Sequence, residues 1–136
     1  MKSIVVFAVF VAFLFGLSGC SSTQVISENS LKHTSWQLIS LNGKKAQFSA
    51  PVSLKFIEAL QVSGSSGCNR YFGSASLQDN TLQVGNLGMT RKLCDEASNA
   101  VEQQFLALLQ SGVKATFIEG KLQLSGEQTF LFKAVK

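Results

Sequence analysis

The residues best suited to chemistry gather in one stretch, Ser63–Cys94, which holds two of the three cysteines, both arginines and the only tyrosine. A pair of cysteines can form a disulfide or ligate a metal. Cys68 and Cys94 have no histidine nearby and no second cysteine pair, so they fall short of a zinc site, and we favour a disulfide. That bridge would bring Arg70 and Arg91 into one neighbourhood, where guanidinium groups can bind carboxylates and other anions.

Five polar or aromatic residues next to these cysteines form a candidate binding set: Asn69, Arg70, Tyr71, Thr90 and Arg91. One interpretation is an outward patch for a small anion or carboxylate, with the tyrosine ring stacked on an arginine. The other interpretation is internal, because polar groups beside a tight turn usually bond the local backbone. Asn69 would then hold the turn, and Arg91 would pair with Asp95 or Glu96.

Catalysis is not expected. His33 is the only histidine, far in sequence from either cysteine, and the eight carboxylates are scattered. The sequence has no phosphate-binding glycine loop and no HExxH or GxSxG motif. We therefore predict no catalytic residue, no metal and no cofactor.

The N-terminus predicts export. Lys2 precedes an apolar run of fourteen residues, Ile4–Leu17, which is shorter than the roughly 20 residues of a membrane span and typical of a secretory signal. Leu17-Ser18-Gly19-Cys20 resembles a lipobox, so residues 1–19 would be removed and the Cys20 sulfur would carry diacylglycerol. An ordinary signal peptide and an uncleaved anchor are the alternatives.

A lipid on Cys20 makes the membrane the first partner. By analogy with other lipoproteins, Ser21 implies the outer membrane of a Gram-negative bacterium, with the domain facing the periplasm. That oxidising compartment favours the Cys68–Cys94 disulfide. Without residues 1–19 the net charge is 11 − 8 = +3, and no basic run or motif suggests nucleic acid. An unidentified envelope protein or a hydrophobic ligand is a further expected partner.

Residues 20–31 are rich in Ser, Thr and Asn and predict a flexible tether before a domain at 32–136. Apolar residues at helical spacing predict one helix, Glu96–Gln110, capped by Asp95 and ended by Gly112. Alternating runs predict strands at 34–41, 52–57, 60–63, 74–78, 81–85, 113–117, 122–124 and 129–135. The fold class is α+β, mainly β: an antiparallel meander curled into a partial barrel, with the helix closing it.

The stretch from Gly67 to Gly73, GCNRYFG, followed by Gly88-Met89-Thr90-Arg91 and by Cys94, resembles the signature of the META domain family. The resemblance extends from about His33 to about Lys133. It implies a small, conical, cracked β-barrel with one helix, and a non-enzymatic envelope lipoprotein active in heat or stress response and novobiocin tolerance. The alternative is a lipid- or peptide-binding barrel that acts, like a pilotin, as an assembly chaperone. A packed interior favours the first function, and an open apolar cleft favours the second.

Overall fold

The structure is a computed structural model that describes Gly19 and residues 24–136. The signal peptide and the lipid-attachment residue Cys20 were predicted from residues that lie outside the described part, apart from Gly19. The elements are α1 (Glu28–Leu31), β1 (Ser35–Leu41), β2 (Lys44–Lys45), β3 (Ser53–Phe56), the 3-10 turn η1 (Glu58–Leu60), β4 (Gln61–Ser65), β5 (Arg70–Gln78), β6 (Thr81–Met89), α2 (Glu96–Ser111), β7 (Val113–Ile118), β8 (Lys121–Ser125) and β9 (Thr129–Val135). None of the described helices is long and apolar enough to span a membrane.

The nine strands form one antiparallel sheet that curls into a ring. Neighbours follow the order β2-β1-β3-β4-β5-β6-β7-β8-β9, and β1 also pairs with β9, which joins the first and last long strands. This ring confirms the predicted curled meander. The β1–β9 pairing covers strand edges that would otherwise be open to other chains.

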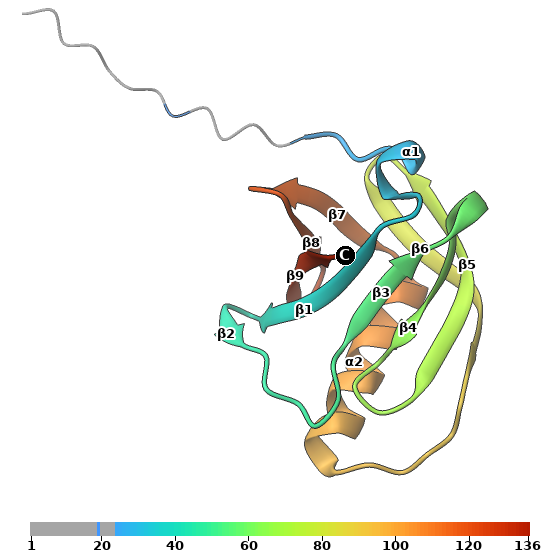
Figure 1. The fold of residues 1–136 in the computed structure, drawn as a ribbon, viewed down its shortest axis with the longest axis vertical. Helices are drawn as coiled ribbons and strands as arrows, with labels where there is room; N and C mark the ends of the chain where they lie inside the picture. The colour runs from blue at the N-terminus through green and yellow to red at the C-terminus, as the bar shows by residue number, and fades with distance from the viewer. Residues whose placement is uncertain (1–18, 20–23) are drawn as a thin grey trace, which may run out of the picture.

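The ring is weakly joined between β6 and β7. Only two residue pairs join these strands, Thr81↔Lys114 and Leu82↔Val113, whereas β5 and β6 pair along most of their length. Helix α2 lies between β6 and β7 in the chain, crosses behind β3 and β4 in the view of Figure 1, and packs against β6. The Gln83 side chain donates to the Gln110 carbonyl oxygen at 2.9 Å and ties the free part of β6 to the helix.

Helix α2 begins and ends as predicted. Asp95 is the N-cap and accepts a hydrogen bond from the Ser98 backbone nitrogen, while Gly112 ends the helix with a φ of 89°. The buried face consists of Ser98, Val101, Glu102, Phe105, Leu106, Leu108 and Leu109. Ala97, four residues before Val101, shares the helical spacing of the apolar residues but is exposed, and Ser98 is buried instead.

The interior of the ring is filled by side chains. Phe105 of α2 reaches Phe130 and Phe132 of β9, with ring centroids 5.6 and 5.9 Å apart. Leu54, Phe56, Leu122 and Leu124, from the strands, are also fully buried. The interior is therefore packed rather than an open apolar cleft.

The tether prediction needs correction for residues 24–31. Gln24 forms an isolated β-bridge with Phe117, and Ile26 and Leu31 are buried in the core. Between them, Ser27 and Ser30 bond each other reciprocally and cap α1. The Ser- and Asn-rich composition concealed these two apolar anchors, so the folded part begins well before residue 32.

The strands around the GCNRYFG motif are longer than predicted. Arg70–Gly73 were expected in a turn, but they open β5, paired with β4 on one side and β6 on the other. Tyr71 and Phe72 are residue types that favour strands, and pairing on both edges outweighs the low strand preference of Gly73. The true turn is confined to residues 66–69.

Candidate functional site

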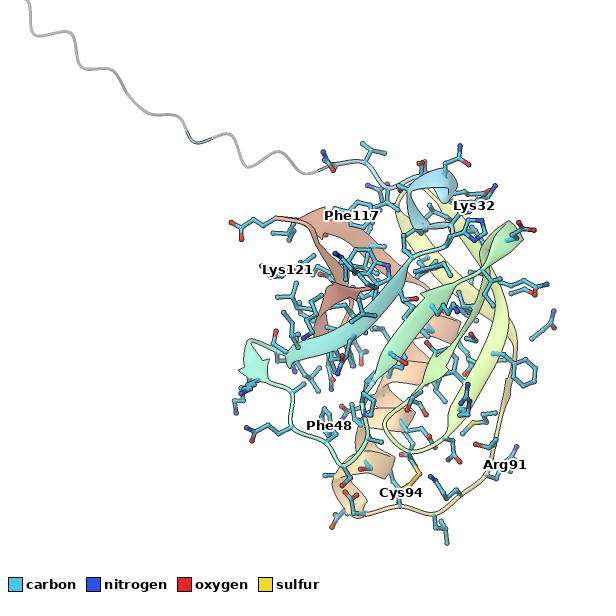
Figure 2. All side chains as sticks on the ribbon, viewed as in Figure 1. Lys32, Phe48, Arg91, Cys94, Phe117 and Lys121 are labelled. Carbon is cyan, nitrogen blue, oxygen red and sulfur yellow. A yellow bond between two sulfur atoms is a disulfide. The ribbon has the colours of Figure 1, made fainter. Side chains whose placement is uncertain are left out.

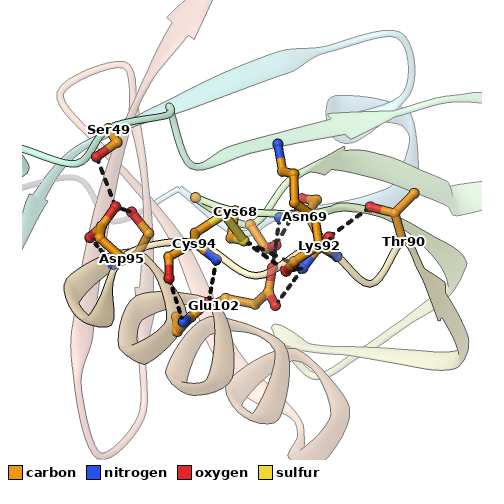
Figure 3. Close-up of a disulfide and its surroundings, with 12 residues drawn as sticks. Ser49, Cys68, Asn69, Thr90, Lys92, Cys94, Asp95 and Glu102 are labelled. Atoms are coloured by element: carbon orange, nitrogen blue, oxygen red, sulfur yellow. Dashed lines mark hydrogen bonds between the residues drawn. A yellow bond between two sulfur atoms is a disulfide. The ribbon is translucent and has the colours of Figure 1, made fainter.

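The structure joins Cys68 and Cys94 in the expected disulfide, with Cα atoms 5.9 Å apart. This separation lies within the usual range of about 4.4–6.8 Å. The bridge links the β4–β5 turn to the loop that leads into α2 (Figure 3). Residues 66–69 and 90–95 therefore form one joint, which we call the disulfide joint.

Asn69 is the hydrogen-bonding centre of the disulfide joint and is only 3% exposed. Its side-chain oxygen accepts from the Thr90 hydroxyl at 2.9 Å and from the Lys92 backbone nitrogen at 2.6 Å. Its side-chain nitrogen donates to the Lys92 carbonyl at 3.1 Å and to Glu102 Oε1 at 3.0 Å. Every polar atom of this amide is thus used inside the chain (Figure 3).

Glu102 comes from the buried face of α2 and completes the joint. Its Oε2 accepts from the Asn69 backbone nitrogen at 2.8 Å and from the Ser66 hydroxyl, which also lies 2.8 Å from the Asn69 carbonyl. Burial acts to raise the pKa of Glu102, but the hydrogen bonds from Ser66 and Asn69 outweigh it and lower the pKa below its ordinary value. The buried carboxylate is therefore ionised at neutral pH.

Tyr71 points into the core. Its hydroxyl donates to the Ser53 carbonyl at 2.8 Å, and its ring packs edge-on against Phe105 with centroids 5.7 Å apart. Burial raises the pKa of Tyr71, so the phenol stays protonated. Of the five residues in the candidate set, Asn69, Tyr71 and Thr90 thus follow the internal interpretation.

Arg70 and Arg91 do not follow the internal interpretation. Both are exposed, and neither forms an ion pair with any residue that the structure describes. The expected pairing of Arg91 with Asp95 or Glu96 is absent there. Asp95 instead bonds the hydroxyls of Ser98 and Ser49 at 2.8 and 2.9 Å and the Ser98 nitrogen, which lower its pKa to about 2. The backbones of Arg70 and Thr90 pair at 3.0 Å, which brings the two arginines onto adjacent segments.

Two open grooves run beside α2. One, of about 550 Å³, lies between the helix and the free part of β6 and is bordered by Met89, Arg91 and Leu106. The other, of about 670 Å³, lies by the C-terminal half of the helix and is bordered by Leu108, Gln128 and Phe130. Both are within the size of small-ligand sites, about 300–1,000 Å³. Arg70 lines neither groove.

His33 lies at the surface, 3.9 Å from Glu58. Within the part of the chain that the structure describes, no three His, Cys, Asp or Glu side chains are grouped as metal ligands.

Sequence reasoning missed Glu102 and Ser66. A signal for Glu102 existed, because it lies four residues after Ser98 and three before Phe105, within the face of the helix that the apolar stripe predicts to be buried. A carboxylate at such a position requires buried donors. Those donors are the Ser66 hydroxyl and Asn69, which the turn brings to the helix.

Known proteins place the chain in a family. Two NMR structures are similar. One matches with a TM-score of 0.72 at 28% identity, covering 80% of this chain and 95% of that one. The other, from Burkholderia xenovorans, matches with a TM-score of 0.65 at 28% identity, covering 79% and 86%. No curated protein matches the chain. The META domain model matches residues 29–136, and the chain therefore belongs to the META domain family.

Proposed function

We propose that this META domain is a non-catalytic envelope lipoprotein, held on the outer membrane by lipid on Cys20 and facing the periplasm. Its role is to support tolerance of envelope stress, including heat and novobiocin. The two exposed arginines are its recognition groups, and the partner carries carboxylate or another anion.

One observation supports this proposal: the buried polar side chains of the family motif, and the carboxylate that contacts them, are used in hydrogen bonds within the chain. The amide of Asn69, the hydroxyl of Tyr71 and the carboxylate of Glu102 are all bonded within the chain. A catalytic acid or base must reach a substrate, and these groups are committed to the fold. The charged groups that the motif presents outward are Arg70 and Arg91, and the ring of Phe72 is exposed beside Arg70 in the same strand.

The same joint supports the proposed location. A disulfide at the centre of a hydrogen-bonded network is suited to an oxidising compartment such as the periplasm. The predicted lipobox before Cys20 is consistent with that setting.

A second function, an assembly chaperone that binds a lipid or hydrophobic peptide, is favoured by the groove at Leu108 and Phe130. Because side chains fill the interior of the ring, such a ligand would bind only at this groove on the outside. A titration with a short-chain lysophospholipid, followed by NMR, tests this candidate. Shifts confined to Leu108, Gln128 and Phe130 would support it, and shifts of no residue there would remove it.

The main proposal is tested in a Gram-negative host that lacks the gene. The wild-type gene should restore survival after a heat shift and growth in novobiocin, and Cys20→Ala should not restore either. Feeding a fatty-acid analogue should label the wild-type protein and leave the Cys20→Ala variant unlabelled. Label on the alanine variant contradicts the anchor, and a deletion strain that tolerates both stresses as well as wild type contradicts the role.

A further inference from the structure

Exposed apolar side chains gather at the end of the ring where the chain enters. The described residues expose six large hydrophobic side chains, and four of them lie at this end: Val25, Ile57, Ile118 and Val135. The Gln24↔Phe117 bridge sets Val25 near Ile118, and Val135 pairs with Ser35 at the start of β1. We call Val25, Ile118 and Val135 the tether-end patch. Val25, 80% exposed, is its most prominent member.

The patch borders a shallow hollow of about 420 Å³ at the mouth of the ring. Trp36, Phe117 and Ala134 line it together with Gln24 and Val135. The rings of Trp36 and Phe117 are 5.7 Å apart. This end therefore offers apolar surface both as protruding side chains and as an aromatic-lined floor.

The opposite end of the domain carries the disulfide joint. Figure 2 places Arg91 and Cys94 far from Phe117 and Lys32. At the tether end, the charges of Lys121 and Glu119, 4.0 Å apart, offset each other, and Glu28 and Lys32 carry opposite charges. Attraction at the tether-end patch is therefore apolar rather than electrostatic.

The length of chain before Gln24 decides what covers this surface. Only four Cα–Cα steps separate Cys20 from Gln24, and a fully extended chain spans at most about 14 Å over that distance. A folded domain of this size has a radius of gyration of about 13 Å, equivalent to a sphere about 34 Å across. A lipid on Cys20 thus keeps the tether end, and no other face, within reach of the bilayer.

We propose that the tether-end patch rests on the bilayer that holds the Cys20 lipid. Val25, Ile118 and Val135 enter the boundary between head groups and acyl chains, as the apolar faces of interfacial segments do. The domain is then oriented with the disulfide joint and Arg91 pointing away from the membrane. This inference rests on the lipid anchor of the proposed function and adds the contact surface and the orientation.

The native reporter for this contact is Trp36, the only tryptophan of the chain and part of the hollow. Full-length lipoprotein, purified from membranes, is reconstituted into phosphatidylethanolamine–phosphatidylglycerol vesicles that contain a lipid with a doxyl quencher at acyl carbon 5. Flotation first measures anchoring. Quenching of Trp36 fluorescence then measures contact, and we expect it to be clear and insensitive to added salt.

Two matched double variants locate the contact. Val25→Asp/Ile118→Asp should lose more than half of the quenching while still floating with the vesicles. Phe72→Asp/Leu93→Asp adds the same charge away from the patch, where Leu93 is 93% exposed, and should keep it. Melting followed by circular dichroism verifies that each variant is folded. Wild-type protein that floats without quenching overturns the inference, as does equal quenching in both variants. Failure of wild-type protein to float overturns the anchor itself.

Discussion

The carboxylate of Glu102 holds Asn69 at two points, with Oε2 2.8 Å from the backbone nitrogen and Oε1 3.0 Å from the side-chain nitrogen. Helix α2 is thereby hydrogen-bonded to the β4–β5 turn directly beside the Cys68–Cys94 bridge (Figure 3). The turn is secured twice, once by a covalent bond and once by hydrogen bonds to a buried charge. Each connection can be removed without the other.

Replacing Glu102 by Gln keeps the size of the side chain but removes its charge. The amide group then presents a donor where the carboxylate accepted from Ser66 and Asn69. We expect a loss of about 1–3 kcal/mol in the free energy of unfolding, the usual cost of leaving buried donors unmatched. Urea unfolding measures it. The matched control is Gln103→Glu, the reverse change at the next, exposed position, which should stay within about 0.5 kcal/mol. Equal losses in the free energy of unfolding at both positions would show that the hydrogen bonds of Glu102 do not stabilise the domain.

The stability of the domain should fall in acid, and Glu102 should account for part of the fall. Its folded pKa lies below the ordinary value of 4.5, so the folded state releases this proton more readily than the unfolded chain. The contribution is complete above pH 4.5 and disappears as the pH falls through the folded pKa. Urea unfolding of wild type and Glu102→Gln at pH 7, 5 and 3 tests this. The difference in the free energy of unfolding between the two proteins should be constant down to pH 5 and smaller at pH 3. A difference that grows in acid contradicts this prediction.

Reduction of the disulfide should destabilise the domain without dissolving its secondary structure. The cysteines are 26 residues apart, and the chain-entropy model gives about 3.5 kcal/mol for a loop of that length. The hydrogen bonds of Asn69 to Glu102 remain in the reduced protein. Thermal melts with and without reductant, and Cys68→Ser/Cys94→Ser, measure the loss. Thiol titration of the native protein is the control: two free thiols at Cys68 and Cys94 before reduction would show that the bridge does not form.

The sequence predicts elements best where one local pattern decides them. Asn42-Gly43 and Asp79-Asn80 are local sequence signals for hairpin turns, and all four residues have positive φ, as tight hairpins require. The stripe of α2 and its Asp95 cap were likewise local signals. Ring closure was inferable as well, since a meander of this many strands leaves edges that must be covered.

The disulfide joint was predictable only in part. The cysteine pair predicted the bridge, but the number of bonds that Asn69 makes depends on residues 23 and 33 positions away. The same limit explains Arg91, whose acidic neighbour Asp95 is engaged by Ser98 and Ser49. It also explains residues 24–31, where two apolar side chains in a polar segment find a core that only the assembled sheet provides.

Gly64 should be among the positions least tolerant of substitution. A Cβ there would lie 2.2 Å from the Ser53 carbonyl oxygen and 2.8 Å from its carbon, and backbone in a paired strand cannot move aside cheaply. Gly64→Ala should therefore unfold the domain or lower its stability by several kcal/mol, as overpacking does at its worst. Gly85→Ala is the matched control, because a Cβ at this strand position meets nothing within 4 Å. It should be neutral or stabilise by up to about 1 kcal/mol. Thermal melting of both variants decides, and equal melting temperatures would contradict the close approach.

The last prediction separates recognition from stability at the two arginines. Because Arg70 and Arg91 are exposed and form no ion pair with the described residues, Arg70→Ala and Arg91→Ala should each change the free energy of unfolding by less than about 0.5 kcal/mol. The pairing of Arg91 with Asp95 or Glu96 that the sequence predicted is absent from the described residues, so Arg91→Ala should not weaken the helix start. The double variant should fold normally yet fail to restore heat and novobiocin tolerance to the deletion strain. Lys44→Ala/Lys45→Ala removes the same charge from exposed β2 and should restore both. A double arginine variant that melts early makes the side chains part of the fold, and one that restores tolerance as well as the lysine control leaves them without a role in recognition.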